Sequence, residues 1–297
     1  MPRIQLTQRD IRVLASLGEY GILDTRLLHR LHFKSVTERR CLQRVEQYVS
    51  HGLVCVIALR VWYCSDRESG RIPRIYGLTE KGADAVEGLT GRPPDRVFRS
   101  EPTPETLLHR LQIVRWRIAF DDAFRQEGLP VPLWIHEQDT RNDLPPKVPP
   151  NQRSVLFHRL GSSGKAVCCK PDAACRFLLP GKNGSEYPFI FYWEIDRSTE
   201  GHEQIRSQKI RGYAELLQSH AFLRYWPDLA EPHVRVIFAC RKDIRERRIA
   251  GLAETFRGTA IEHLVRFIPY QDCAPTKLLR GAVWSDVSGR KRSILHD

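Results

Sequence analysis

Four charged residues in the second half of the chain have the types and spacing that phosphodiester chemistry needs. Asp172 opens one apolar run, and Glu194 and Asp196 close the next. Lys209 follows in a helical run. Alternate residues of a strand share a face, so Glu194 and Asp196 project together while Ile195 points to the other side. Acidic groups at neighbouring strand ends, with a lysine nearby, can hold a divalent metal against a phosphodiester.

Helical periodicity directs Lys209 toward these carboxylates. At 3.6 residues per turn, one narrow stripe contains Ile205, Lys209, Gly212, Tyr213 and Leu216. A lysine in an otherwise apolar stripe is unexpected, because lysine is rarely buried without a partner. We therefore expect its ammonium to face the strands that carry the carboxylates.

The order of these residues resembles the PD-(D/E)xK nuclease superfamily, which has the restriction-endonuclease-like fold. Pro171–Asp172 matches the PD element, and Glu194-Ile195-Asp196 matches (D/E)xK with aspartate in place of lysine. In some branches of that superfamily the lysine moves to the next helix, where Lys209 lies. The run from Lys209 to Tyr213 also resembles the QxxxY motif of the RecB-like branch, with lysine in place of glutamine.

A narrower resemblance is to the replication-relaxation family, whose members join a winged helix to this kind of core. They show an E-x-D-x-x-T strand end, here Glu194, Asp196 and Thr199. The chain is also similar to plasmid mobilisation relaxases of the MOBC class, which use a restriction-endonuclease-like site instead of a nucleophilic tyrosine. These resemblances extend over roughly residues 5–90 and 100–245.

The resemblance implies a role for each residue of the site. Asp172, Glu194 and the carbonyl of Ile195 would hold Mg²⁺ or Mn²⁺ beside the scissile phosphate, where the metal lowers the pKa of a bound water. Asp196 would be a further ligand or would orient that water. Lys209 would stabilise the developing negative charge.

The first 90 residues predict a winged helix-turn-helix. Thr7 and Asp10 form the N-terminal cap of one helix, Asp24 caps a second, and Ser35 with Glu38 forms a capping box for a third. An alternating strand, a polar tip and a return strand then form a hairpin before a fourth helix.

In this family of folds the third helix enters the major groove and the hairpin lies along the DNA backbone. Basic side chains there contact phosphates, and one or two side chains read base edges. The candidates are Lys34, Thr37, Arg39, Arg40, Arg44, Arg67, Arg71 and Arg74. The net charge of +12 favours a polyanionic partner. Two alternatives stay open, a merely solvated helix face and a winged helix that binds protein.

The predicted fold class is α/β (α+β), with four segments. Residues 1–90 form the winged helix-turn-helix, and residues 91–104 form a linker rich in proline and arginine. Residues 105–280 form a restriction-endonuclease-like αβ core with a central mixed sheet, and residues 281–297 form a basic, poorly packed tail. The core begins with a long helix from Thr103–Pro104 to Glu127. Glu105 and His109 on it are secondary site candidates, because the superfamily often has an acidic residue or a histidine on its first core helix.

Cysteine usage and hydropathy bear on the compartment. The eight cysteines are scattered, no CxxC pair occurs and no signal peptide is apparent, so we expect reduced thiols in the cytoplasm. Cys168, Cys169 and Cys175 are interpreted as small buried hydrophobic residues, not as metal ligands. No apolar run approaches the ~20 residues of a membrane span. The motifs of nucleotide-driven motors, serine hydrolases and zinc proteases are missing.

These patterns favour a mobile-element protein that binds a specific site on double-stranded DNA and nicks or cuts it with Mg²⁺. Such chemistry would serve plasmid relaxation, mobilisation or replication initiation. Partners would be a second copy of the chain or other replication, mobilisation or transposition proteins. The alternatives are a non-catalytic DNA-binding regulator with a degenerate nuclease fold and a transposase-partner endonuclease. A separate alternative is that Glu194 and Asp196 only form ion pairs with Arg197 or Arg211. A covalent role for Tyr213 is also considered.

Overall fold

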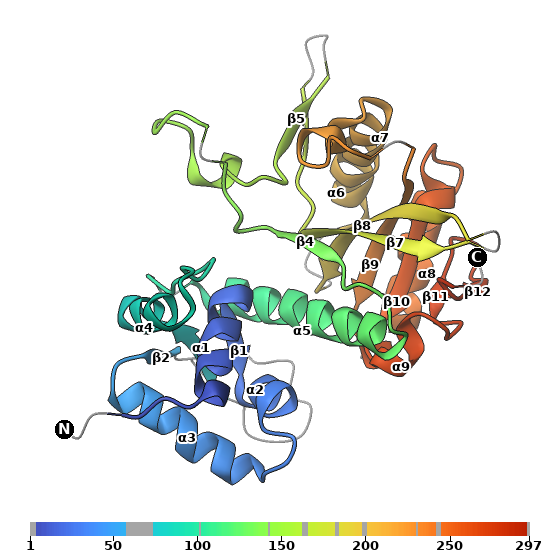
Figure 1. Ribbon diagram of the computed structural model, residues 1–297. Helices are drawn as coiled ribbons and strands as arrows, with labels where there is room; N and C mark the ends of the chain where they lie inside the picture. Colours follow the sequence, from blue (N-terminus) through green and yellow to red (C-terminus); the bar gives the residue numbers. More distant parts are fainter. Residues whose placement is uncertain are drawn as a thin grey trace. The chain divides into compact units, whose positions relative to one another are not determined.

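The computed structural model forms two compact units, residues 1–115 and 116–297 (Figure 1). It describes residues 4–57, 74–100, 102–141, 143–161, 166–181, 184–197, 201–229, 231–241 and 245–295. The division falls within α5 (Pro104–Gln126). The predicted linker 91–104 and the first residues of the predicted core therefore belong to the first unit. The predicted long helix is continuous across this division.

The first unit alternates helices with short strands. Its elements are α1 (Gln8–Tyr20), β1 (Ile22–Asp24), α2 (Thr25–His32), α3 (Glu38–Ser50), β2 (Val54–Ile57), β3 (Ile75–Leu78) and α4 (Glu80–Thr90). The strands form an antiparallel sheet in the order β1-β3-β2. The four helices and the strands β2 and β3 follow the predicted order, and β1 is an additional strand that the sequence did not predict. The tip of the predicted hairpin, with Arg67 and Arg71, lies outside the described residues.

Helix starts in this unit follow from side-chain caps. Thr7 and Asp10 form the predicted capping box of α1, and Asp24 accepts from the backbone of Leu27 at the start of α2. The third start differs from the prediction. Thr37, not Ser35, is the N-cap of α3, because its side chain accepts a hydrogen bond from the backbone of Arg40.

A buried ion pair ties α1 to α3. Asp10 is fully buried and accepts hydrogen bonds from the guanidinium of Arg44 and the hydroxyl of Tyr48. Burial alone would raise the pKa of Asp10, but the hydrogen bonds from Arg44, Tyr48 and Thr7 outweigh it and hold this pKa well below its usual range. Arg44, predicted to contact DNA, is thus engaged within the fold.

The second unit is built on a mixed seven-stranded sheet in the order β12-β11-β10-β9-β8-β7-β4. Its strands are β4 (Leu133–His136), β7 (Ala173–Pro180), β8 (Glu186–Asp196), β9 (His233–Cys240), β10 (Val265–Pro269), β11 (Trp284–Ser285) and β12 (Lys291–Arg292). β8, β9 and β10 run parallel, and the other neighbours are antiparallel. The predicted α/β class with a central mixed sheet is confirmed.

Helices cover both faces of this sheet. On one face Trp116 and Phe120 of α5 pack against Phe191 and Trp193 of β8. The other face is covered by α7 (Arg211–Gln218) and α8 (Arg245–Phe256), and α6 (His202–Gln204) and the π-helical segment η3 (Ile205–Ile210) lead into α7 (Figure 1). The described part of the chain contains no helix long and apolar enough to cross a membrane.

Shorter elements complete the unit. β5 (His158–Leu160) and β6 (Val167–Cys169) form a separate antiparallel pair. β6 ends before Pro171, and β7 begins after it at Ala173. The remaining elements are η2 (Pro150–Gln152), η4 (Ala221–Arg224), η5 (Glu262–Leu264), η6 (Tyr270–Asp272) and α9 (Pro275–Leu278).

The C-terminal segment is not the poorly packed tail that its charge predicts. Trp284 is buried against Phe191 and Trp193, and its indole nitrogen donates to the carbonyl of Leu278 at 2.8 Å. β11 pairs with β10, which is therefore an interior strand of the sheet. Burial of one large aromatic side chain outweighs the polarity of its neighbours.

We predict that Asp10→Asn lowers the free energy of unfolding at pH 7 by about 3 kcal/mol, because it removes the buried partner of Arg44. A lowered carboxyl pKa stabilises the fold above the unfolded value of ~3.9, and this contribution is lost as the pH falls below it. The difference between wild type and variant should therefore shrink between pH 5 and pH 3 in urea titrations. The control is Glu46→Gln, which removes an exposed ion pair with Arg74 and should cost under ~0.5 kcal/mol. An equal cost for both variants would contradict the prediction.

Candidate functional site

The adjoining ends of β7 and β8 bring Asp172 and Glu194 together. Ala173 pairs with Trp193 across the two strands, so Asp172, one residue earlier, lies opposite Glu194. The backbone N–H of Asp172 donates to the carbonyl of Trp193 at 3.0 Å. Its side-chain Oδ2 accepts from the backbone N–H of Ile195 at 2.7 Å. The Asp172 carboxylate therefore continues the strand ladder and is held beside the acidic end of β8.

Glu194 is buried and held by two donors from the following helical segment. Lys209 Nζ lies 2.6 Å from Glu194 Oε2. The hydroxyl of Tyr213 donates to Oε1 at 2.6 Å. The structure thus brings Lys209 to the acidic strand end, as helix periodicity predicts, and adds a second contact from the same stripe.

Local backbone features allow this approach. Lys209 lies in the π-helical segment η3, a conformation that occurs mostly as single turns and often at functional sites. In α7, Gly212 lies against β6, and a Cβ atom there would come within 3.1 Å of Cys169 Cβ. Glycine therefore lets the helix pack close to the strand pair. Periodicity predicts the stripe, but no feature of the sequence marked the π turn.

Burial has the largest effect on the pKa values of Glu194 and Tyr213. Burial raises the pKa of Glu194 to about 7, the charge of Asp172 adds to this, and Lys209 and Tyr213 oppose it. Burial, with the charge of Glu194, also raises the pKa of Tyr213 well above its usual value. Tyr213 is thus a neutral hydrogen-bond donor to a carboxylate, which disfavours its use as an anionic nucleophile.

Asp196 has a partner that the sequence did not identify. Arg248 of α8 donates from Nε to Asp196 Oδ2 and from Nη2 to Oδ1, both at 2.8 Å. The hydroxyl of Tyr270 donates to the Asp196 carbonyl at 3.3 Å. No local sequence pattern identified Arg248 as this partner, because it lies 52 residues from Asp196 along the chain.

Comparison with known proteins adds the family. A model of the replication-relaxation family matches residues 14–227, more than half of the chain. The chain belongs to the replication-relaxation family. No curated protein and no solved structure matches the chain. The matched range contains Asp172, Glu194, Asp196 and Lys209 and ends before Arg248. Membership of the replication-relaxation family associates the chain with DNA and with the replication or relaxation of a plasmid or other mobile element.

The oxygen donors at this strand end fit a magnesium-type cation. Asp172, Glu194 and the backbone carbonyl of Ile195 are hard ligands, and Mg²⁺ is usually bound through one or two carboxylates with water and phosphate completing its shell. The raised pKa of Glu194 reflects a buried charge that a cation would offset. Among the described residues no group of three or more His, Cys, Asp and Glu side chains could hold a metal ion.

The DNA-binding candidates of the first unit fall into two groups. Lys34, Thr37, Arg39 and Arg40 are exposed at the start of α3. Arg74 is also exposed and pairs with Glu46 at 3.0 Å. Arg44, in contrast, belongs to the buried Asp10 network. The secondary candidates Glu105, exposed, and His109, partly buried, lie on the part of α5 that belongs to the first unit.

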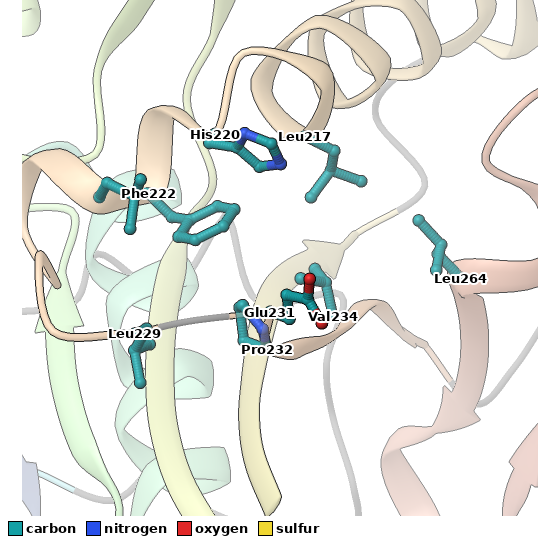
Figure 2. A pocket seen from close by; sticks show the side chains of 9 residues that line it. Leu217, His220, Phe222, Leu229, Glu231, Pro232, Val234 and Leu264 are labelled. Atoms are coloured by element: carbon teal, nitrogen blue, oxygen red, sulfur yellow. The ribbon is translucent and has the colours of Figure 1, made fainter.

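A cavity of about 440 Å³ lies beside the C-terminal end of α7 (Figure 2). Leu217, Phe222, Leu229, Val234 and Leu264 line it, and His220 and Glu231 lie at its polar parts. None of the predicted site residues lines this cavity, so it is separate from the carboxylate site.

We predict that the melting temperature of Glu194→Gln, relative to that of wild type, increases as the pH rises. Because the folded-state pKa of Glu194 is raised above the unfolded value of ~4.3, its contribution to stability is present below that value and is lost as the pH rises to about 7. The variant cannot ionise, so the melting temperature of the variant minus that of wild type should increase from pH 5 to pH 8. Melting curves in EDTA would show this, with Glu254→Gln at an exposed position as the control. A difference that is constant or falls with pH would refute the assignment.

Proposed function

We propose that this replication-relaxation protein binds duplex DNA and nicks or cuts it with Mg²⁺ or Mn²⁺ at the strand end formed by Asp172 and Glu194. One observation carries the proposal. The four residues predicted from sequence come from three separate segments, and the fold brings three carboxylates and a partly buried lysine to one end of the sheet. Such a combination of groups suits phosphodiester hydrolysis.

Each side chain has a task in this proposal. Asp172, Glu194 and the carbonyl of Ile195 would hold the cation, which supplies a more acidic bound water and offsets charge on the phosphate. The backbone N–H of Ile195 orients the Asp172 carboxylate. Tyr213 fixes one oxygen of Glu194, so that the other faces Lys209. Lys209 then has its ammonium at the site, where it would stabilise negative charge on a phosphate oxygen.

DNA binding is assigned to the first unit, read as a winged helix-turn-helix. The exposed residues at the start of α3 are a lysine, a threonine and two arginines, the side chains that contact phosphates and base edges. The net charge of +12 supports long-range attraction of a polyanion. Duplex DNA is the partner that fits both observations.

A second candidate is a non-catalytic DNA-binding factor. The observation that favours it is that Glu194 and Asp196 are both engaged by cationic side chains, Lys209 and Arg248. Such ion pairs also occur in proteins whose fold supports binding but not catalysis.

We predict metal-dependent conversion of a supercoiled plasmid, carrying the native flanking sequence, to open circles. Lys209→Ala, Asp172→Asn and Glu194→Gln should each lower the rate by about 10²-fold or more, because each removes a charged group from the reacting centre. Lys277→Ala, which alters an exposed lysine of the same unit, is the control. Linear product would indicate paired cuts on both strands.

A readout without catalysis accompanies this assay. Mg²⁺ should raise the melting temperature of wild type, because a ligand of the folded state stabilises it, but not that of Glu194→Gln. Salt-sensitive DNA binding with neither nicking nor a metal-dependent shift would overturn the nuclease proposal and establish the non-catalytic factor.

We predict that the double variant Arg39→Gln/Arg40→Gln weakens DNA binding and lowers its salt dependence. Each lost phosphate contact reduces the slope of log K against log salt by about 0.9, so the slope should fall by roughly two. Arg44→Gln should mainly lower stability, because its guanidinium is held by Asp10. Fluorescence anisotropy over a salt series would test both. If the double variant keeps the wild-type slope, Arg39 and Arg40 of α3 do not contact DNA phosphates.

A further inference from the structure

Two ion pairs lie side by side at the end of β8. Glu194 and Asp196 are two residues apart on one face of the strand, so their Cα atoms are separated by about 6.6 Å. Lys209 of η3 pairs with the first at 2.6 Å, and Arg248 of α8 pairs with the second at 2.8 Å. Because α8 packs against η3 and α6, the two cations come from adjoining helical elements.

The Asp196–Arg248 pair is largely removed from solvent, with side-chain exposures of 6% and 9%. A buried ion pair is weak support for a fold, since apolar residues of similar volume often stabilise as well or better. Its geometry is the two-pronged contact that guanidinium groups make with carboxylates and equally with phosphates. Asp196 is therefore a chemical counterpart of a phosphate on Arg248.

Formal charges favour joint binding of a cation and a phosphate. Asp172, Glu194 and Asp196 are acidic, and Lys209 and Arg248 are basic, which leaves a formal charge of −1. A divalent cation alone would make the site positive, and a phosphodiester alone would make it more negative. Both together leave it neutral. Each ligand should therefore strengthen binding of the other.

We propose that Arg248 binds a backbone phosphate of DNA and that Asp196 holds this arginine in the DNA-free protein. On binding, the phosphate replaces the carboxylate of Asp196 on Arg248, and this released carboxylate faces the cation. This inference rests on the proposed function in one respect, that DNA lies over this end of the sheet.

The test compares duplex-DNA affinity in EDTA, over a salt series, for the full-length chain and its variants. Arg248→Gln should bind more weakly, with a salt slope lower by about 0.9. Asp196→Asn should bind at least threefold more tightly, because it removes the carboxylate that competes with phosphate. Arg176 and Asp228 form a matched pair in the same unit, with Arg176 Nη1 at 2.6 and 2.7 Å from the two carboxylate oxygens. Arg176→Gln and Asp228→Asn therefore control for the change in net charge.

Opposite shifts for Asp196→Asn and Arg248→Gln, each larger than that of its control, are expected. Shifts in the same direction, or shifts equal to the controls, would show that the pair serves the fold alone and would overturn the proposal. Should Asp196→Asn fail to fold, Arg248→Lys decides, because it should keep the wild-type salt slope that Arg248→Gln loses. These measurements need no cleavage. Absence of nicking in the plasmid assay would contradict the proposed nuclease function. The phosphate contact of Arg248 would still be decided by the binding measurements alone.

Discussion

A carboxylate buried at the end of a central strand must be neutralised or hydrogen-bonded, and Glu194 imposes this requirement on the second unit. It lies where β8 ends beside Asp172, so two acidic groups share a poorly solvated region. Two side chains four residues apart in one helical stretch, Lys209 and Tyr213, donate hydrogen bonds to the Glu194 carboxylate. That stretch can reach the strand because Gly212 leaves room against Cys169. The position of α7 on the sheet is thus tied to the chemistry of one side chain.

The same requirement explains why the site is asymmetric along β8. Glu194 is held by a lysine and a tyrosine, whereas Asp196, one step further along the same face, is held by the fork of Arg248. Lysine is a compact point charge, and arginine makes fixed paired contacts. The two positions therefore differ in how readily a competing anion or cation can exchange with the existing partner. An arginine matched to a two-oxygen anion is suited to phosphate, and a lysine beside two carboxylates is suited to a site shared with a cation.

Much of this arrangement could be predicted from the sequence, and the failures have physical causes. Strand alternation placed Glu194 and Asp196 on one face, and helix periodicity placed Lys209 toward them, because both rules are local. Trp284 was assigned to a loose tail because its neighbours are polar, and only the assembled sheet shows the aromatic pocket that it fills. Arg248 was missed for the same reason, since its partner is 52 residues away along the chain. Local pattern also could not reveal that the guanidinium of Arg44, a DNA-binding candidate, is held by the buried Asp10.

The presence of so many charged groups at one strand end bears on whether the site binds ligands. A fold kept only as a platform gains nothing from placing Asp172 beside the buried Glu194, because their repulsion and the desolvation of Glu194 both cost stability. Apolar side chains in place of Glu194, Lys209 and Tyr213 would satisfy the same packing without a pKa raised by burial. Strain of this kind is usually stored where a ligand relieves it. A cation beside Glu194 and a phosphate beside Lys209 and Arg248 would relieve both the repulsion and the desolvation, which is what the proposed function requires of its ligands.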